Sequence, residues 1–196
     1  FASVYNVSVD SCIKIFEVAK NEKDKITGLN FIEKIEIPFG NSVVSLGCDK
    51  NGILYFLQKN GMAYSVNVYN FTSKEMRQVV MPYERMEIQG LSICSANEKT
   101  EVYFSYTLPD TMPRVGFFEM ANQNDSENVI LKLCQNDFSG GMFNPIKIEE
   151  NQIIYIAEFL AGNKIFKADL AKLDFEEIPL KIISEGFTSS DKDDIN

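Results

Sequence analysis

The stretch SVVSLGCDKNGILYFLQKNGMAYSVNV, residues 42–68, decides the predicted fold of this 196-residue chain. Two turn signals, Asp49–Gly52 and Lys59–Gly61, separate three short runs that are rich in β-branched and aromatic residues. A fourth run, Arg77–Met81, follows and ends at Pro82. This order of strands and turns predicts an antiparallel meander of four strands.

The same order recurs along the chain, with polar turns at Asn97–Lys99 and Glu149–Asn151. Four alternating strands end in a polar residue followed by an apolar one: Glu17-Val18, Asn67-Val68, Glu119-Met120 and Asp169-Leu170. These pairs lie 50, 52 and 50 residues apart, and a four-strand repeat of this length is typical of a β-propeller. A β-sandwich is the alternative, because short strands with regular turns also describe that fold.

We therefore predict an all-β propeller of four four-stranded antiparallel blades, at residues 1–40, 41–85, 86–137 and 138–186, with an acidic disordered tail at 187–196. The first unit offers only three strands, and its innermost strand is missing. The last unit is expected to close with Glu177–Ile182 as its outer strand. This arrangement favours an arc cut from a larger ring of five to eight blades; a compact four-bladed ring is the alternative.

Composition excludes several functions. The chain has 19 basic and 28 acidic residues, a net charge of −9, which is the wrong sign for binding nucleic acid and favours a protein partner with a basic surface. It contains no histidine, so histidine-based triads, dyads and zinc sites cannot form within it. No apolar run is long enough to span a membrane. We expect a non-enzymatic binding or scaffold protein.

Polar residues in the turns between the first and second strands are the candidate metal ligands. Oxygen ligands of this kind suit Ca²⁺, which would occupy the central channel, and no other cofactor is expected. The alternative is that these residues only supply turn geometry. The candidates are Asp49, Asn51, Asn97, Glu98, Glu149 and Asn151.

Two further patterns bear on the compartment. Three tripeptides match the N-glycosylation acceptor, at Asn6, Asn70 and Asn124, and favour secretion without deciding it. The four cysteines lack the close spacing of a zinc site and fit either buried thiols or a disulfide. They are Cys12, Cys48, Cys94 and Cys134.

Two segments carry a resemblance to a known family. Residues 49–56, DKNGILYF, followed by residues 108–118, LPDTMPRVGFF, resemble consecutive blades of the Yellow and major royal jelly proteins. The chain departs from that family in having no tryptophan. The resemblance implies a secreted six-bladed propeller that binds a ligand, with no catalytic residues to carry over. The alternative function is a secreted propeller that binds a small ligand, as this resemblance implies, or a Ca²⁺-dependent hydrolase with its site in the channel, as the polar turn residues would allow.

Overall fold

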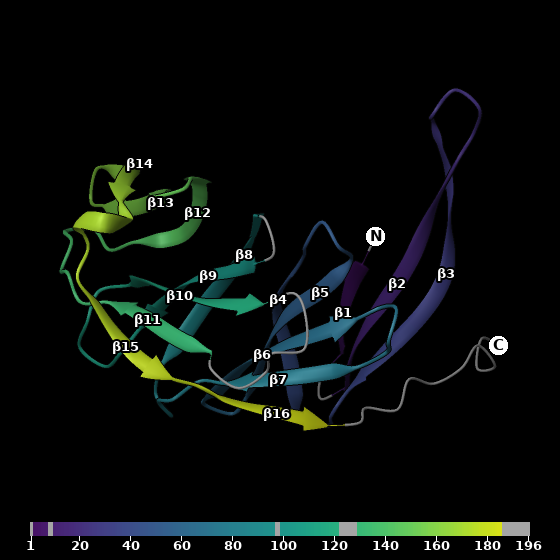
Figure 1. Cartoon of the computed structure of the whole chain (residues 1–196), viewed down its shortest axis with the longest axis horizontal. Helices are drawn as coiled ribbons and strands as arrows, with labels where there is room; N and C mark the ends of the chain where they lie inside the picture. Colours follow the sequence, from purple (N-terminus) through teal and green to yellow (C-terminus); the bar gives the residue numbers. More distant parts are fainter. Residues whose placement is uncertain (1, 8–9, 97–98, 122–128, 186–196) are drawn as a thin grey trace.

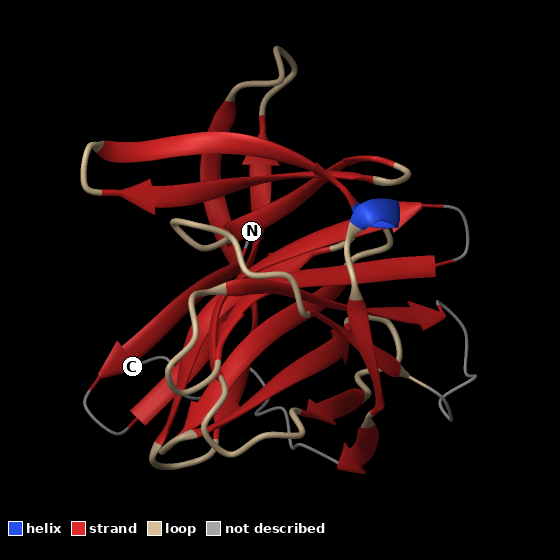
Figure 2. Ribbon diagram, turned by 90° about the vertical axis from the view of Figure 1, so that its left-hand side faces the viewer, coloured by secondary structure: helices blue, strands red, loops and turns tan. Residues whose placement is uncertain are grey.

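The computed structural model describes residues 2–7, 10–96, 99–121 and 129–185. These residues form an all-β structure of four antiparallel sheets, with one short 3₁₀ turn at Leu170–Lys172. The sheets follow one another in chain order, from β2 and β3 at the right of Figure 1 to β12–β14 at the upper left. In Figure 2 the strands account for most of the ribbon and the 3₁₀ turn is blue. No helix in the described part is long and apolar enough to cross a membrane.

The first sheet has three strands and the second has five. The first contains β1 (Ala2–Val7), β2 (Asp10–Lys20) and β3 (Ile26–Ile37). The second contains β4 (Asn41–Cys48), β5 (Ile53–Asn60), β6 (Ala63–Asn70), β7 (Met76–Val80) and β16 (Lys181–Glu185).

The third sheet has five strands and the fourth has three. The third contains β8 (Glu87–Ala96), β9 (Lys99–Thr107), β10 (Arg114–Ala121), β11 (Ile130–Cys134) and β15 (Phe175–Pro179). The fourth contains β12 (Phe143–Glu149), β13 (Gln152–Phe159) and β14 (Gly162–Asp169).

The strand numbers of the predicted four-stranded blades are wrong, because the four sheets have three, five, five and three strands. The prediction for the last strand is also wrong. Residues 177–182 do not close the fourth sheet, because β15 pairs with β11 of the third sheet and β16 pairs with β7 of the second. This route buries apolar side chains: Phe175 packs edge-on against Phe117, with ring centroids 5.3 Å apart, and Leu180 is 9% exposed. The residues of β14, by contrast, are mostly exposed.

Each pair of successive sheets encloses its own hydrophobic core. Strand alternation sends Tyr55 and Leu57 toward the third sheet and Leu54 and Phe56 toward the first, so β5 is buried on both faces. Tyr103 is also fully buried, in the core between the third and fourth sheets. The recurring aromatic residues of the second strands are therefore core residues.

Hydrogen bonds also join neighbouring sheets. The Asn6 amide bridges the first and second sheets by donating from Nδ2 to the Val43 carbonyl at 3.0 Å. The Leu91 N–H donates to Ser45 Oγ at 3.1 Å, and the Asn144 N–H donates to Ser105 Oγ at 2.7 Å. The first strands β4, β8 and β12 consequently lie against one another in succession.

Candidate functional site

A pocket of about 690 Å³ lies at the seam between the third and fourth sheets. Strands β8, β9 and β10 form one side of it, and β12 with its following turn forms the other. Its lining is mostly charged: Cys94, Lys99, Glu101, Glu119, Lys147, Ile148, Glu149, Glu150 and Asn151.

Three residues form a row across the third sheet. Cys94 on β8 pairs with Glu101 on β9, and Glu101 pairs with Glu119 on β10. Because directly opposed residues have Cβ atoms about 5 Å apart, the two carboxylates repel each other. The row is therefore stable only if cations compensate it.

Two lysines supply that compensation. Lys99 Nζ lies 3.0 Å from Glu119 Oε2, whereas Lys147 reaches across from β12 to bind Glu101 Oε2. The two ion pairs differ in burial: the Lys147 and Glu101 side chains are 10% and 17% exposed, while Lys99 and Glu119 are 68% and 38% exposed. The inner pair therefore ties the two sheets together and the outer pair lies at the rim.

Tyr103 adds a hydrogen bond beneath the inner pair. Its hydroxyl donates to Glu101 Oε2 at 3.2 Å. Burial raises the pKa of this tyrosine, and the charge of Glu101 raises it further. At the rim, the hydrogen bond to Glu119 raises the pKa of Lys99, which stays cationic. The Tyr103 hydroxyl is thus a neutral donor and the lysine is a fixed charge.

The remaining charges give the pocket its chemistry. Four glutamates face two lysines, which leaves two negative charges in excess. Within the described residues, neither Glu149 nor Glu150 forms an ion pair, and both are exposed at the mouth of the pocket. The pocket can therefore accept a positively charged group. Among the residues that the structure describes, no group of three or more acidic or cysteine side chains is arranged to hold a metal ion.

The predicted turn residues fall into different places. Glu149 and Asn151 line the pocket, but Asp49 is buried at the tip of the β4–β5 hairpin. Asp49 Oδ1 accepts the backbone N–H groups of Asn51 and Ile53, both at 2.8 Å, and Oδ2 accepts Thr100 Oγ1 at 3.3 Å. Its carboxylate therefore holds its own turn and also bonds to the next sheet.

Several predicted features lie outside the described residues. These are the candidate ligands Asn97 and Glu98, the glycosylation candidate Asn124, and the tail at 187–196. Of the other two glycosylation candidates, Asn6 carries the bridge to Val43. Asn70 Oδ1 accepts the N–H groups of Thr72 and Ser73 at 2.8 and 3.2 Å, which shapes the β6–β7 turn.

All four cysteines are free thiols. Cys12 and Cys134 are buried, Cys94 is partly exposed at the pocket, and Cys48 is exposed at the end of β4. Burial raises the pKa of Cys134, so this thiol is a weak nucleophile at neutral pH.

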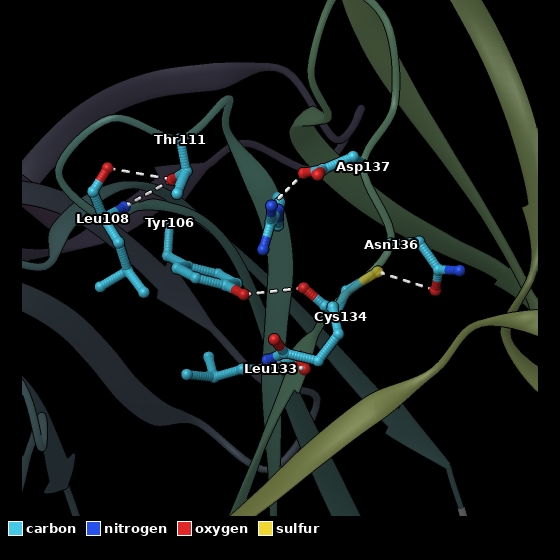
Figure 3. Close-up of polar contacts among 9 residues, drawn as sticks. Tyr106, Leu108, Thr111, Leu133, Cys134, Asn136 and Asp137 are labelled. Atoms are coloured by element: carbon cyan, nitrogen blue, oxygen red, sulfur yellow. Dashed lines mark hydrogen bonds and ion pairs between the residues drawn. The ribbon is translucent and has the colours of Figure 1, made fainter.

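A second polar cluster closes the far end of the third sheet (Figure 3). The Tyr106 hydroxyl donates to the Cys134 carbonyl at 2.7 Å, and the Cys134 thiol points to Asn136 Oδ1 at 3.7 Å. Arg114 pairs with Asp137, and although burial opposes its charge, Asp137 and Tyr106 raise its pKa overall. This cluster fixes the loop after β11.

Most of the charged residues that line the pocket are not predicted from the sequence. Lys99, Glu101 and Tyr103 occupy one face of β9 by simple alternation, so their shared orientation is visible in the sequence. The approach of Lys147 from β12 is not visible, because it depends on how two sheets pack.

Comparisons with known proteins found no matching family model, no matching curated protein and no matching solved structure.

Proposed function

We propose that this chain is a non-enzymatic binding protein, and that the pocket between its third and fourth sheets accepts a lysine or arginine side chain of a basic protein partner. The excess negative charge of the pocket lining supports this most directly. The overall charge of −9 favours the same class of partner, because it attracts basic surfaces over long range.

The division of charge within the pocket favours a cationic ligand. Lys99 and Lys147 already neutralise Glu119 and Glu101, so Glu149 and Glu150 are the carboxylates left to bind an incoming cation. Ile148, which is 44% exposed, offers an apolar surface beside them. A lysine or arginine side chain can use both the carboxylates and this apolar surface. Its aliphatic stem packs on apolar groups while its charged end stays near carboxylates.

The propeller architecture is part of the proposal. Successive face-to-face sheets whose first strands lie side by side support an arc of propeller-type blades. A larger ring of five to eight blades and the resemblance to the Yellow proteins stay predictions. Under this proposal the rigid sheets position the loops and turns that contact the partner.

Matched peptides provide the test. We would titrate the full chain with a fluorescent peptide carrying one central arginine and with the same peptide carrying citrulline, which has nearly the same shape but no charge. We expect the arginine peptide to bind about tenfold more tightly, and to lose that advantage at high salt. The double variant Glu149→Gln/Glu150→Gln should remove the preference, whereas Glu84→Gln, an exposed glutamate in the β7–β8 connection, should preserve it.

Equal binding of the two peptides would contradict the proposal. So would a preference for arginine that survives in the double variant, because the charge responsible would then lie elsewhere on this acidic chain.

A further inference from the structure

The outer edge of β14 is unpaired within the described structure. In the second and third sheets the corresponding strands, β6 and β10, pair on their outer sides with β7 and β11. The fourth sheet has no described strand at that place, because β15 continues to the third sheet instead. An eight-residue strand therefore presents free backbone groups.

The pairing with β13 identifies those groups. The Leu170 N–H donates to the Asn151 carbonyl at 2.7 Å, just beyond the paired residues Gln152 and Asp169. Hydrogen bonds alternate along an antiparallel pair, so Ala168 and every second residue before it bond to β13. Asn163, Ile165 and Lys167 consequently direct their N–H and C=O groups away from the sheet.

This edge lacks the features that protect the other edge strands. Pairing along β3, β4, β8 and β12 is interrupted by register shifts, and β1, β15 and β16 have six residues or fewer. β14 pairs with β13 without a shift over all eight residues, and it contains no proline. Its Ile165 side chain is 75% exposed. A long, regular and exposed edge can accept another strand, but lysines on it disfavour any strand that does not neutralise them.

The charges on β14 indicate which strand would fit. Lys164 and Lys167 lie on opposite faces of the strand, and neither forms an ion pair with a described residue; Lys164 sits over the Phe159 ring at 5.8 Å. Opposite charges directly across two strands stabilise their pairing. A strand with acidic residues three positions apart would place one carboxylate opposite each lysine.

We propose that the outer edge of β14 binds an extended acidic segment of a protein partner, which adds to the fourth sheet as a further antiparallel strand. The main-chain hydrogen bonds of Asn163, Ile165 and Lys167 supply the affinity, and the two lysines select acidic residues at positions i and i+3. Ile165 packs against an apolar residue between them. This site is separate from the pocket, so either proposal can fail without the other.

The test uses a labelled eight-residue peptide of alternating valine and threonine, with glutamate at positions i and i+3. Two matched peptides carry lysine at those positions, or methylated backbone nitrogens on the side that faces β14. Fluorescence anisotropy with the full chain should show that the glutamate peptide binds at least about tenfold more tightly than either.

One variant pair isolates the backbone contribution. Ile165→Pro removes an N–H that points away from β13, so no internal hydrogen bond is lost, and edge strands tolerate proline. Ile165→Val keeps the N–H and is the control. Peptide binding should be lost in the proline variant and kept in the control, and Lys164→Gln/Lys167→Gln should weaken the glutamate peptide to the level of the lysine peptide.

Hydrogen exchange of the wild-type chain gives a second readout that does not depend on any variant. The amides of residues 163, 165 and 167 should exchange fast in the free protein and become protected when the glutamate peptide is added. Failure of the peptide to bind, or equal binding to both Ile165 variants, would overturn the proposal. Protection of these amides before peptide is added, rising with protein concentration, would also overturn it by showing that a second copy occupies the edge.

Discussion

Replacing Lys147 by methionine tests how the pocket is held together. Methionine keeps a flexible side chain of similar length but removes the charge that compensates Glu101. Glu101 then faces Glu119 across two paired strands, with Tyr103 as its remaining described hydrogen-bond donor. Lys99→Met is the matched control, because it removes the same charge from the same pocket at a more exposed pair.

Burial sets the expected magnitudes. Breaking a fully buried ion pair costs about 3–5 kcal/mol in the free energy of unfolding, and an exposed pair contributes about 0–1 kcal/mol. The Lys147 pair, at 10% and 17% exposed, lies nearer the first case, so we expect Lys147→Met to lower the free energy of unfolding by about 2 kcal/mol. Lys99→Met should cost much less, because its ion pair is exposed to solvent.

Urea denaturation of the two variants, at low salt and near 1 M salt, measures these differences. A double-mutant cycle with Glu101→Gln should give a coupling energy above about 1 kcal/mol for Lys147. Salt should reduce the small cost of Lys99→Met more completely than that of Lys147→Met, because exposed charges are screened more. Equal costs for the two lysines, or no coupling between Lys147 and Glu101, would refute the assignment of Lys147 as the tie between the sheets.

Three further predictions concern the cores. Burial raises the pKa of Tyr55 from its ordinary value of 10 to about 12. The stabilisation that depends on its neutral hydroxyl is therefore complete below about pH 10, and about 2 kcal/mol of it is lost as the pH rises toward 12. Tyr55→Phe removes this titration, so the stability of the wild type relative to the variant should fall by about 2 kcal/mol between pH 9 and pH 12 in denaturation curves, and a constant difference would contradict the burial argument. Glu33 accepts a hydrogen bond from the Tyr69 hydroxyl, and both burial and Glu33 raise the pKa of Tyr69. Glu33→Gln should therefore lower the pKa of Tyr69 in an ultraviolet titration. An unchanged titration would show that the two groups do not interact. A Cβ added at Gly116 would lie 2.5 Å from Phe104 Cε2, so Gly116→Ala should cost about 2 kcal/mol in thermal or urea unfolding, and a neutral effect would mean that the ring moves aside.

Much of the strand order could be predicted because turns and alternation are local signals. The turn at Asp49–Gly52 lies between β4 and β5 as predicted, and Tyr55, Tyr103 and Tyr155 are all buried in the cores between sheets. The first unit forms a three-stranded sheet, which its sequence also indicates.

Strand partners could not be predicted in the same way. Alternation within Glu177–Ile182 shows which side chains share a face, but the partner strand depends on which free edge lies beside apolar surface. Phe175 and Leu180 pack against apolar side chains of the third sheet, so this segment does not pair with the fourth sheet.

The candidate site could be predicted only in part, for the same reason. Glu149 and Asn151 were identified from their turn, yet the same reasoning selected Asp49, whose carboxylate is fully engaged by backbone groups and Thr100. The sequence does not distinguish an acidic residue that shapes a turn from one that lines a pocket. Lys147 was missed because its role depends on the distance between two sheets.

The proposed pocket can be tested by locating where a basic side chain binds. We would titrate the isotopically labelled full chain with arginine methyl ester and follow the backbone amide signals by nuclear magnetic resonance. If the pocket binds the guanidinium group, salt-sensitive shifts should be confined to residues 99–101 of β9 and residues 147–151 of β12 and its turn. Shifts centred elsewhere, or scattered over the acidic surface without saturation, would contradict the claim that this pocket binds a cationic group.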